Sequence, residues 1–390
     1  MMKKLLLKFI FLLLLLDQPA YAANTADADA KSVNLEITCA TGQNNCFDNL
    51  NDLQTWVKTT RKPDSSSQLT VRISNGTFSA TSSTAFNCDS DFTGYIHMIG
   101  EGASNSIIQI GQPGDFASFY NVSGCQKMEF SFLSFNTASN YGYVTWSKGG
   151  SSRWNNVEIS GKGAAWIDGT CGATEGTHYW YSSKLTSQQS LTAARSYQAS
   201  CDKTWLFGSE VTSIVQEGGD VSGNNAGYNN AVVAQGNANN SNIPEIHLYG
   251  SNIRAISYGT VTNPSYYIRG TVHADNGGEV HIHGTGIDSI SESGQDIIVM
   301  SVESGGTIHA NESAYVIKTT GNATRIINSG GTIKAPYVWE PKTSAPAITS
   351  VDGADTFVDT SGTTPTMYIY ASGCSFAGGP WISTAGQCRQ

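Results

Sequence analysis

Several titratable side chains in the middle of the chain are of the types that perform acid–base chemistry. Asp168 and His178 can exchange a proton with a substrate, and the guanidinium of Arg153 can stabilise a uronate or an oxyanion. These three residues are the candidate catalytic residues. Further acidic side chains in the same region are Glu175, Glu217 and Asp220. The alternative is that all of them are loop and turn residues, since no tight Asp cluster of the calcium-binding kind accompanies them.

Aromatic residues gather in the same part of the chain, where five of the eight Trp residues lie. An exposed ring offers a flat apolar face to the C–H groups of a sugar, and nearby polar side chains can bind its hydroxyl groups. This pattern predicts a sugar-binding groove, whereas the alternative is that the rings fill the interior of the fold. The candidate substrate-binding residues are Trp146, Trp154, Trp166, Tyr179, Trp180 and Tyr181.

Matched segments within residues 244–335 indicate how the chain positions its side chains. The run that begins at Glu245 returns at Glu279, and shorter versions begin at Thr307 and Thr332. The last two steps are 28 and 25 residues long, and repeats of this length are typical of a solenoid. Each repeat divides into three apolar pieces separated by Asn and Gly, so the sequence predicts three strands per coil.

The repeat also predicts an outward ladder of side chains. Alternation along a strand turns Ile246 and Leu248 inward and His247 outward. Coils stacked in register then place one outward side chain above the next, in the order His247, His281, His309 and Lys334. Imidazoles about 4.8 Å apart can share a zinc or copper ion with a neighbouring Glu. A three-ligand geometry does not follow from the sequence, so we expect a solvated ladder that binds no stoichiometric divalent metal and no cofactor.

Three early segments follow an order known from other solenoids. They are Val71 to Phe78, Ile96 to Gly102, and Ser106 to Ile108. They resemble the opening coils of right-handed parallel β-helix proteins of the pectin lyase-like superfamily, where a G-T-Y/F turn precedes an I-x-G-x-G turn and a T-I-I-like strand. The resemblance covers most of residues 47–340 and implies an all-β, right-handed parallel β-helix solenoid. It does not specify an activity, because the superfamily includes lyases, esterases, hydrolases and non-catalytic surface proteins.

Two strands of the aromatic region are similar to motifs of the pectin methylesterases in particular. They are His178-Tyr179-Trp180-Tyr181 and Trp205-Leu206-Phe207-Gly208. In that family a nucleophilic Asp opens the second motif, but Thr204 occupies the position here. The family's G-R-P-W arginine has no counterpart in this chain. The similarity therefore implies coil geometry rather than methylesterase activity.

The N-terminus has the pattern of a cleaved secretory signal. It begins with basic residues, continues with an apolar run from Leu5 to Leu16, and ends in Ala20-Tyr21-Ala22. Cleavage near Ala22 predicts a secreted, periplasmic or cell-surface protein. The alternative, an uncleaved membrane anchor, requires a longer apolar run. We expect three parts: the signal peptide at 1–22, the parallel β-helix with its N-terminal cap at 23–342, and a C-terminal cap at 343–390.

Both ends of the predicted solenoid need a cover for their apolar coils. Leu53, Trp56 and Val57 have helical spacing within Asp48 to Thr60, which predicts one amphipathic capping helix that ends before Pro63. Past the repeats, the sequence predicts two strands, Thr356 to Asp359 and Met367 to Tyr370. The small C-terminal cap that contains them would be locked by a disulfide.

Eight Cys residues in an exported chain favour disulfides over metal binding, because no close CxxC pair occurs. Nearest-neighbour pairing gives Cys39 with Cys46, Cys88 with Cys125, Cys171 with Cys201, and Cys374 with Cys388. The first and last of these pairs close the shortest loops at the ends of the solenoid.

The overall charge limits the partners of the protein. The chain has 22 Lys and Arg and 31 Asp and Glu, and residues 1–22 contain three Lys and one Asp, so the mature chain has 19 basic and 30 acidic residues and a net charge of −11. Nucleic acid and anionic membranes are therefore disfavoured partners, and no mature segment is long and apolar enough to span a membrane. We expect a protein that binds a polysaccharide or cell-surface glycan. Catalytic modification of the bound glycan is an additional hypothesis. The alternative is a non-catalytic, adhesin-like or structural surface protein, and no oligomeric state is predicted.

Overall fold

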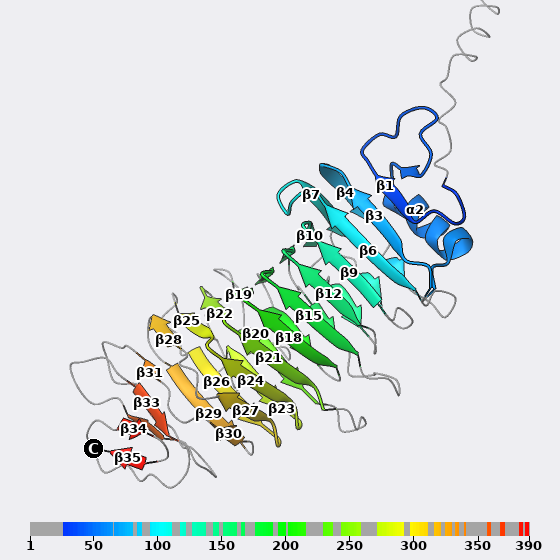
Figure 1. The fold of residues 1–390 in the computed structure, drawn as a ribbon. Coiled ribbons are helices and arrows are strands. Elements are labelled where there is room, and N and C mark those ends of the chain that lie inside the picture. Colours follow the sequence, from blue (N-terminus) through cyan, green and yellow to red (C-terminus); the bar gives the residue numbers. More distant parts are fainter. Residues whose placement is uncertain are drawn as a thin grey trace, which may run out of the picture.

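The structure is a computed structural model. It describes residues 26–64, 66–80, 84–87, 94–110, 118–121, 127–137, 143–147, 151–161, 165–167, 176–189, 194–199, 202–215, 229–236, 243–258, 271–291, 297–310, 316–320, 324–329, 332–334, 339–340, 357–359, 367–370, 382–384 and 387–389. Within these residues the chain folds into an elongated stack of coils made of three long β-sheets (Figure 1).

Sheet A contains 12 strands and is parallel throughout. In spatial order its strands are β2 (Cys46–Phe47), β1 (Ser32–Leu35), β3 (Leu69–Ile73), β6 (Tyr95–Gly100), β9 (Lys127–Ser131), β12 (Ser152–Asn155), β15 (Thr177–Tyr181), β18 (Lys203–Phe207), β21 (Glu245–Tyr249), β24 (Glu279–His283), β27 (Thr307–Ala310) and β30 (Thr332–Lys334).

Sheet B also contains 12 strands, and sheet C contains nine. The strands of sheet B are β32 (Phe357–Asp359), β33 (Met367–Tyr370), β31 (Trp339–Glu340), β28 (Val316–Thr320), β25 (Gly286–Ser291), β22 (Asn252–Ser257), β19 (Glu210–Val215), β16 (Lys184–Gln189), β13 (Glu158–Gly161), β10 (Ser134–Thr137), β7 (Ser106–Ile110) and β4 (Gly76–Ala80). The strands of sheet C are β29 (Thr324–Ser329), β26 (Ile297–Glu303), β23 (Val272–Asp275), β20 (Asn229–Gln235), β17 (Ala194–Ala199), β14 (Ala165–Ile167), β11 (Tyr143–Ser147), β8 (Ser118–Asn121) and β5 (Thr84–Asn87).

Each coil contributes one strand to each sheet in the order A, B, C. This order repeats nine times from β3 to β29, and each strand pairs in parallel with the strand three positions later in the chain. The predicted division into three strands per coil is confirmed, since the repeat that begins at Thr307 forms β27, β28 and β29. The chain is therefore an all-β solenoid of parallel sheets.

The turns between strands explain why the repeats contain glycine. In each coil from β9 to β24 one residue between sheets A and B adopts a left-handed conformation, and it is Gly208, Gly250 and Gly284 in the later of these coils, with φ of 55°, 55° and 54°. Between sheets C and A, a Cβ on Gly278 or Gly306 would collide with the carbonyl oxygen of Ala234 or Ala274. Glycine thus allows the coils to approach closely and keeps them in register.

The interior of the coils is filled by alternate residues of the strands. Ile246 and Leu248 are 0% exposed, as are Val280 and Ile282 one coil later, which confirms the predicted inward alternation. Their neighbours His247 and His281 lie on the outer face. Because the period of a strand is two, each strand of sheet A has one face in the core and one face toward solvent.

One helix lies at the N-terminal end of the solenoid (Figure 1). It comprises α2 (Leu50–Trp56), which continues as the π-helix η1 (Val57–Arg61), and it buries Leu53, Trp56 and Val57, as predicted. The side chain of Asn49 accepts a hydrogen bond from the Asp52 amide and so starts the helix, which ends before Pro63. The Cys39–Cys46 disulfide, also predicted, lies in this part of the chain.

The described C-terminal segments leave the parallel pattern. β31 pairs with β28 in parallel, but β33 pairs with β31 and β32 in antiparallel fashion. The two predicted strands thus exist and extend sheet B beyond the last coil. β34 (Ile382–Thr384) and β35 (Gln387–Arg389) form a separate hairpin. The Cys88, Cys125, Cys171, Cys201 and Cys374 sulfurs, and the signal sequence at 1–22, lie outside the described residues.

Candidate binding face on sheet A

The outer face of sheet A carries three columns of side chains, one above another in exact strand register. The first column is Thr177, Lys203, Glu245, Glu279 and Thr307. The central column is Tyr179, Trp205, His247, His281 and His309, and the backbone of Lys334 on β30 continues its register. The third column is Tyr181, Phe207, Tyr249 and His283. The predicted outward ladder is confirmed from His247 to His309, which form the later part of the central column, and for Lys334 the structure describes only the backbone.

The rings of the central column stack face to face. Ring centroids are 5.0 Å apart for Tyr179 and Trp205 and 5.1 Å apart for Trp205 and His247. The imidazoles of His247, His281 and His309 follow at 4.3 Å per step and lie within 10° of parallel. Five rings on five consecutive strands therefore form one continuous stack.

The third column forms a second stack beside the first. Its centroid distances are 5.1 Å from Tyr181 to Phe207, 5.1 Å from Phe207 to Tyr249, and 4.4 Å from Tyr249 to His283. All four side chains are partly exposed. Since a stacked ring contacts its neighbours through its faces, the rings of both columns present mainly their edges to solvent. The polar groups of these rings include phenol hydroxyls and an indole N–H, whereas Nε2 of His281 and Nε2 of His309 are shielded from solvent.

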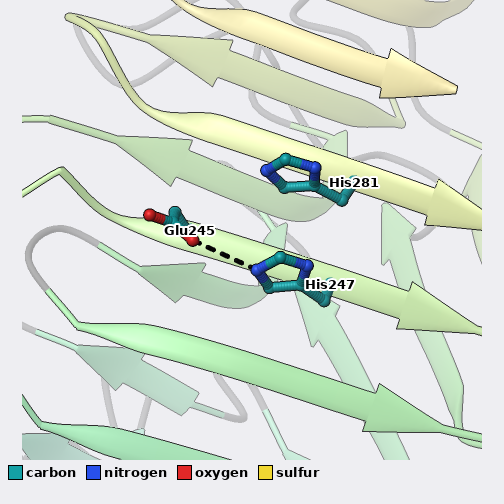
Figure 2. A group of neighbouring side chains, drawn as sticks. All are labelled: Glu245, His247 and His281. Atoms are coloured by element: carbon teal, nitrogen blue, oxygen red, sulfur yellow. Dashed lines mark hydrogen bonds and ion pairs between the residues drawn. The ribbon is translucent and has the colours of Figure 1, made fainter.

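Carboxylates of the first column contact the imidazoles. Glu245 Oε2 lies 3.2 Å from His247 Nε2, and Figure 2 shows this pair with His281 on the next strand. The other Glu245 oxygen pairs with Lys203 Nζ at 2.8 Å. Glu279 Oε2 lies 3.3 Å from His281 Nε2 and 3.2 Å from His309 Nε2. Each Glu thus sits at the edge of the imidazole stack, but only Glu245 also contacts a lysine in the described residues.

The crowded imidazoles change the protonation of this face. Burial lowers the pKa of His281 to about 4, the nearby His247 and His309 act in the same direction, and Glu279 and Glu245 oppose them without outweighing them. Partial burial acts to raise the pKa of Glu245, but hydrogen bonds from Lys203 and His247 and the Lys203 charge outweigh it, so that this pKa is lowered. At neutral pH the face therefore combines a neutral imidazole at His281 with an ionised carboxylate at Glu245.

Toward the N-terminus the same outer face carries a polar network instead of ring stacks. His97 Nε2 lies 3.0 Å from Ser131 Oγ, and Asn155 Nδ2 donates to Glu129 Oε1 at 2.7 Å. The Tyr95 hydroxyl donates to Glu129 as well. Burial lowers the pKa of His97, and the charge of Arg72 adds to this effect. The two ring columns are therefore a feature of the coils from β15 onward.

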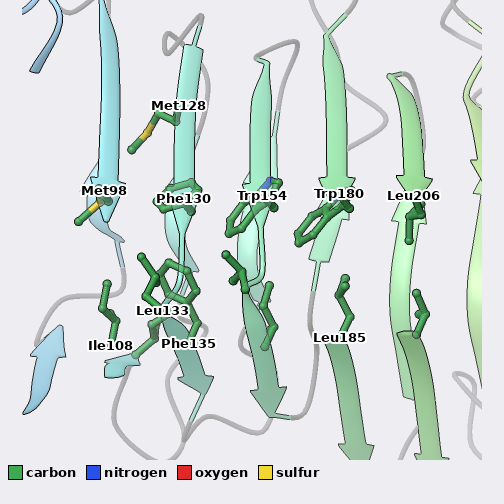
Figure 3. Packing of buried hydrophobic residues seen from close by; sticks show 14 of the residues in the cluster. Met98, Ile108, Met128, Phe130, Leu133, Phe135, Trp154, Trp180, Leu185 and Leu206 are labelled. Carbon is green, nitrogen blue, oxygen red and sulfur yellow. The ribbon is translucent and has the colours of Figure 1, made fainter. Parts of the chain in front are cut away.

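Two of the predicted sugar-binding rings lie in the core. Trp154 and Trp180 are 0% exposed, and their rings stack at 4.4 Å and 6° from parallel (Figure 3). Phe130 stacks on Trp154 from the other side at 4.2 Å. These indoles hold the coil interior together, so the binding role expected for Trp154 and Trp180 is corrected. Tyr179 and Tyr181, on the alternate positions of β15, do reach the outer face.

The predicted catalytic residues do not meet. Arg153 is exposed on the outer face of β12, whereas His178 is 1% exposed and points inward from β15. Because the two side chains leave opposite faces of sheet A, they cannot act on one substrate. Asp168, Glu175, Glu217 and Asp220 lie outside the described residues. Trp146 and Trp166 pair in register on β11 and β14 of sheet C, and the structure describes only their backbone.

His178 belongs to a buried line of hydrogen bonds. Its Nε2 lies 2.9 Å from Asp202 Oδ2, and its Nδ1 lies 2.7 Å from Ser152 Oγ. The Trp154 indole N–H donates to the same Ser152 oxygen at 2.7 Å. The order Ser, His, Asp is that of nucleophilic hydrolases, but Ser152 is only 4% exposed and Asp202 is 0% exposed. This row of hydrogen bonds therefore satisfies buried polar groups and connects three successive coils.

Sequence reasoning missed several side chains of the outer face. Trp205, Phe207, Tyr249 and His283 were not among the predicted binding residues, although the strand period predicts an outward side chain at Tyr249. The strand register identifies them once β15 and β18 are aligned with β21 and β24. Trp205 aligns with His247, and the other three lie two residues after a position of the central column. Lys203 follows from the same alignment with Glu245.

Comparisons with known proteins give no family for this chain: no family model matches it, and neither a curated protein nor a solved structure is significantly similar to it. Within the part of the chain that the structure describes, no helix has the length and apolar character needed to cross a membrane. The functional argument therefore depends on the outer face of sheet A itself.

Proposed function

We propose that this protein binds a polysaccharide or cell-surface glycan along the outer face of sheet A. The observation that carries the proposal is the pair of adjacent ring columns, which continues without a break from β15 to β24 and presents partly exposed edges. No other stretch of the described outer surface has such a continuous double row of stacked rings.

The columns favour a polymer with a regular repeat. Their rungs follow the strand spacing of about 4.8 Å, so the five rings from Tyr179 to His309 extend over about 19 Å. Hydroxyl and nitrogen groups recur along this length, and so do the charges of Lys203, Glu245 and Glu279. An extended sugar chain offers hydroxyls at comparable regular intervals. Because the ring faces are occupied within the stacks, we propose recognition mainly by hydrogen bonds rather than by sugars stacked on the rings.

The proposal includes the wider setting inferred from the sequence. We propose an exported protein with the right-handed coil of the pectin lyase-like superfamily, in which the N-terminal helix and the disulfide-locked C-terminal segment cap the solenoid. The three parallel sheets, the Cys39–Cys46 disulfide and the acidic composition support this proposal. We propose binding rather than turnover at Arg153 and His178, since these side chains lie on opposite faces of the sheet.

A second candidate is a non-catalytic structural surface protein, such as an adhesin-like stalk. The observation in its favour is that the ring faces contact one another from coil to coil, which stiffens the solenoid. Each aromatic pair adds about 0.5–1.5 kcal/mol beyond its burial. In this case the two ring columns would only stabilise the stacking of the coils and would not contact a ligand.

A polysaccharide array separates the two candidates. The purified protein is applied to the array, and reducing ends and unsaturated products are measured to detect turnover. Trp205→Ala and Tyr249→Ala remove one ring from each column. Arg254→Ala is the matched control, because Arg254 is exposed on sheet B, away from both ring columns, and forms an ion pair with Asp288 at 2.9 Å.

Binding by the wild type and by Arg254→Ala, with a loss of at least about tenfold in both ring variants, supports the proposal; tenfold corresponds to about 1.4 kcal/mol. Binding that is equal in all four proteins contradicts it. Absence of binding on a broad array favours the structural candidate. Product formation would add an activity to the binding function and would require a search for its site outside the Arg153 and His178 pair.

A further inference from the structure

We propose that Glu279, His281 and His309 form a binding site for one divalent transition-metal ion, zinc or copper. The three side chains come from β24 and β27 on the outer face of sheet A. The inference goes beyond glycan binding and does not depend on it.

The distances fit a shared ion. Glu279 Oε2 lies 3.3 Å from His281 Nε2 and 3.2 Å from His309 Nε2. Around a tetrahedral zinc ion with bonds of about 2.0–2.1 Å, two ligand atoms are about 3.3 Å apart. The three potential ligand atoms lie within 4.8 Å of one another. Two of the three ligand pairs are thus already at the separation that coordination requires.

The two nitrogens are suited to a metal rather than to a hydrogen bond. Nε2 of His281 and Nε2 of His309 are both shielded from solvent, and neither makes a hydrogen bond in the described structure. Their contacts with Glu279 are therefore close but not aligned for N–H donation. A buried polar atom without a hydrogen bond is costly, and a metal ion bound to the nitrogen lone pairs removes that cost.

The local charge selects Glu279 over the equivalent residue one coil earlier. Glu245, His247 and His281 form a similar trio. However, Glu245 already pairs with Lys203 at 2.8 Å, whereas the residue that follows Glu279 in the first column is the neutral Thr307. Glu245 and Glu279 are also direct register neighbours. Two adjacent carboxylates beside a single lysine favour a bound cation at the carboxylate without the lysine.

Binding requires a small change in the stack. The rings of His281 and His309 are 2° from parallel with centroids 4.3 Å apart, so their lone pairs point in the same direction. At least one ring must rotate about its Cβ–Cγ bond to direct both nitrogens at one ion. Three protein ligands leave a further coordination position open to water or to a ligand group. The proposal departs from the expectation of a metal-free ladder, because register alone does not reveal how Glu279 reaches two imidazoles.

The test is a zinc titration of the metal-free protein, produced without a polyhistidine tag and treated with a chelator. Isothermal titration calorimetry gives the stoichiometry and the affinity. Thermal unfolding with and without zinc is the second readout, since an ion that binds only the folded state raises the melting temperature. Copper substitution, with nitrogen couplings in its electron paramagnetic resonance spectrum, reports the number of bound imidazoles.

We expect one equivalent of zinc and two coordinated imidazoles. Glu279→Gln, His281→Gln and His309→Gln should each weaken binding by more than about 100-fold, since each removes a direct ligand. His97→Gln is the matched control, because His97 also lies on sheet A beside a glutamate, with His97 Nε2 3.8 Å from Glu129 Oε1, but belongs to no trio. It should retain wild-type affinity.

Three results would overturn the proposal. The first is a wild-type protein that binds no zinc up to millimolar concentration. The second is binding that persists in Glu279→Gln and His309→Gln. The third is binding that is lost in His247→Gln but kept in His309→Gln, which would place the ion in the Glu245 trio instead. Circular dichroism of each variant confirms that a loss of binding does not reflect a loss of fold.

Discussion

Sheet A carries stacked rings on both of its faces, and the two kinds of stack overlap only at β15. On the inner face, Phe130, Trp154 and Trp180 stack at 4.2 and 4.4 Å and are 0% exposed. On the outer face, the stack runs from Tyr179 to His309 and remains partly exposed. The inner rings exclude water from the coil, whereas the outer rings bring hydroxyl and nitrogen groups to the surface.

The inner stack ends on β15 with Trp180, and the outer central stack begins on the same strand with Tyr179. Trp180 lies in the core, and the residue in register with it on the next strand is Leu206. Trp205, one residue earlier, is instead in register with Tyr179 on the outer face. A shift of one position thus moves an indole from the core to the surface. The comparison teaches that the position of a ring along the strand, not its presence in an aromatic cluster, decides between packing and binding.

The largest expected effect comes from removing an inner ring. Trp180→Ala should lower the free energy of unfolding by about 3–5 kcal/mol, because it opens a cavity in a closely packed core. Trp205→Ala should cost only about 1 kcal/mol, since its ring is partly exposed. Urea unfolding followed by circular dichroism measures both. Equal losses in the two variants would contradict the distinction between the inner and outer stacks.

The buried polar line should be the next most sensitive part. His178→Ala removes the hydrogen bond to Asp202 Oδ2 and leaves a fully buried carboxylate with one donor fewer. We expect a loss of about 2–4 kcal/mol in the free energy of unfolding. In the same urea experiment, Ser152→Ala should cost about 1 kcal/mol, because it removes a neutral partner. A His178→Ala protein as stable as the wild type would show that the line has no structural role.

Acid should weaken the outer imidazole stack. The pKa of His281 is lowered from 6.5 to about 4 in the folded protein, so between these values the unfolded chain binds more protons than the folded one. Its contribution to stability is complete above pH 6.5 and falls as the pH decreases toward 4. After allowance for partial exposure we expect a loss of about 2 kcal/mol, since one pKa unit corresponds to about 1.4 kcal/mol.

Urea unfolding at several pH values in the presence of a chelator measures this dependence. His281→Gln removes the titrating group and should flatten the dependence of the unfolding free energy on pH between 6.5 and 4. His97→Gln is the control and should leave most of this dependence unchanged if it arises from the imidazole stack. An unchanged slope in His281→Gln would assign the acid sensitivity to other groups.

The smallest effect is expected on sheet B, away from both stacks. Arg254 contacts Asp288 in an ion pair at 2.9 Å, and 48% of the Arg254 side chain is exposed. Arg254→Ala should change the free energy of unfolding by less than about 1 kcal/mol, because such pairs are screened by water and salt. Its glycan and zinc affinities should equal those of the wild type. A large change in either affinity would indicate that the functional surface includes sheet B.

Repeats and alternation made the coil architecture predictable. The matched segments at Glu245 and Glu279 gave the register of the ladder, and the inward positions of Ile246 and Leu248 followed from the period of a strand. The N-terminal helix followed from the spacing of Leu53, Trp56 and Val57. These features depend on local periodicity, which the sequence displays directly.

The candidate site was less predictable, because it depends on which face each ring occupies. The middle coils lack an obvious repeat motif, so the parity of Trp154 and Trp180 relative to His247 could not be assigned from the sequence. Their burial became clear only when β15 and β18 were aligned with β21. The contact of Glu279 with two imidazoles depends on side-chain conformation, which periodicity does not report.

Hydroxyl-radical footprinting with and without the glycan that binds best on the array tests the central claim most directly. Radicals oxidise accessible Trp, Tyr and His side chains, and a bound glycan protects those that it covers. We predict that Trp205, Tyr249 and His283 are oxidised in the free protein and protected in the complex, while Trp154 and Trp180 stay unmodified in both. Protection confined to sheets B or C, with the sheet A columns oxidised equally in both states, would contradict the assignment of the binding face.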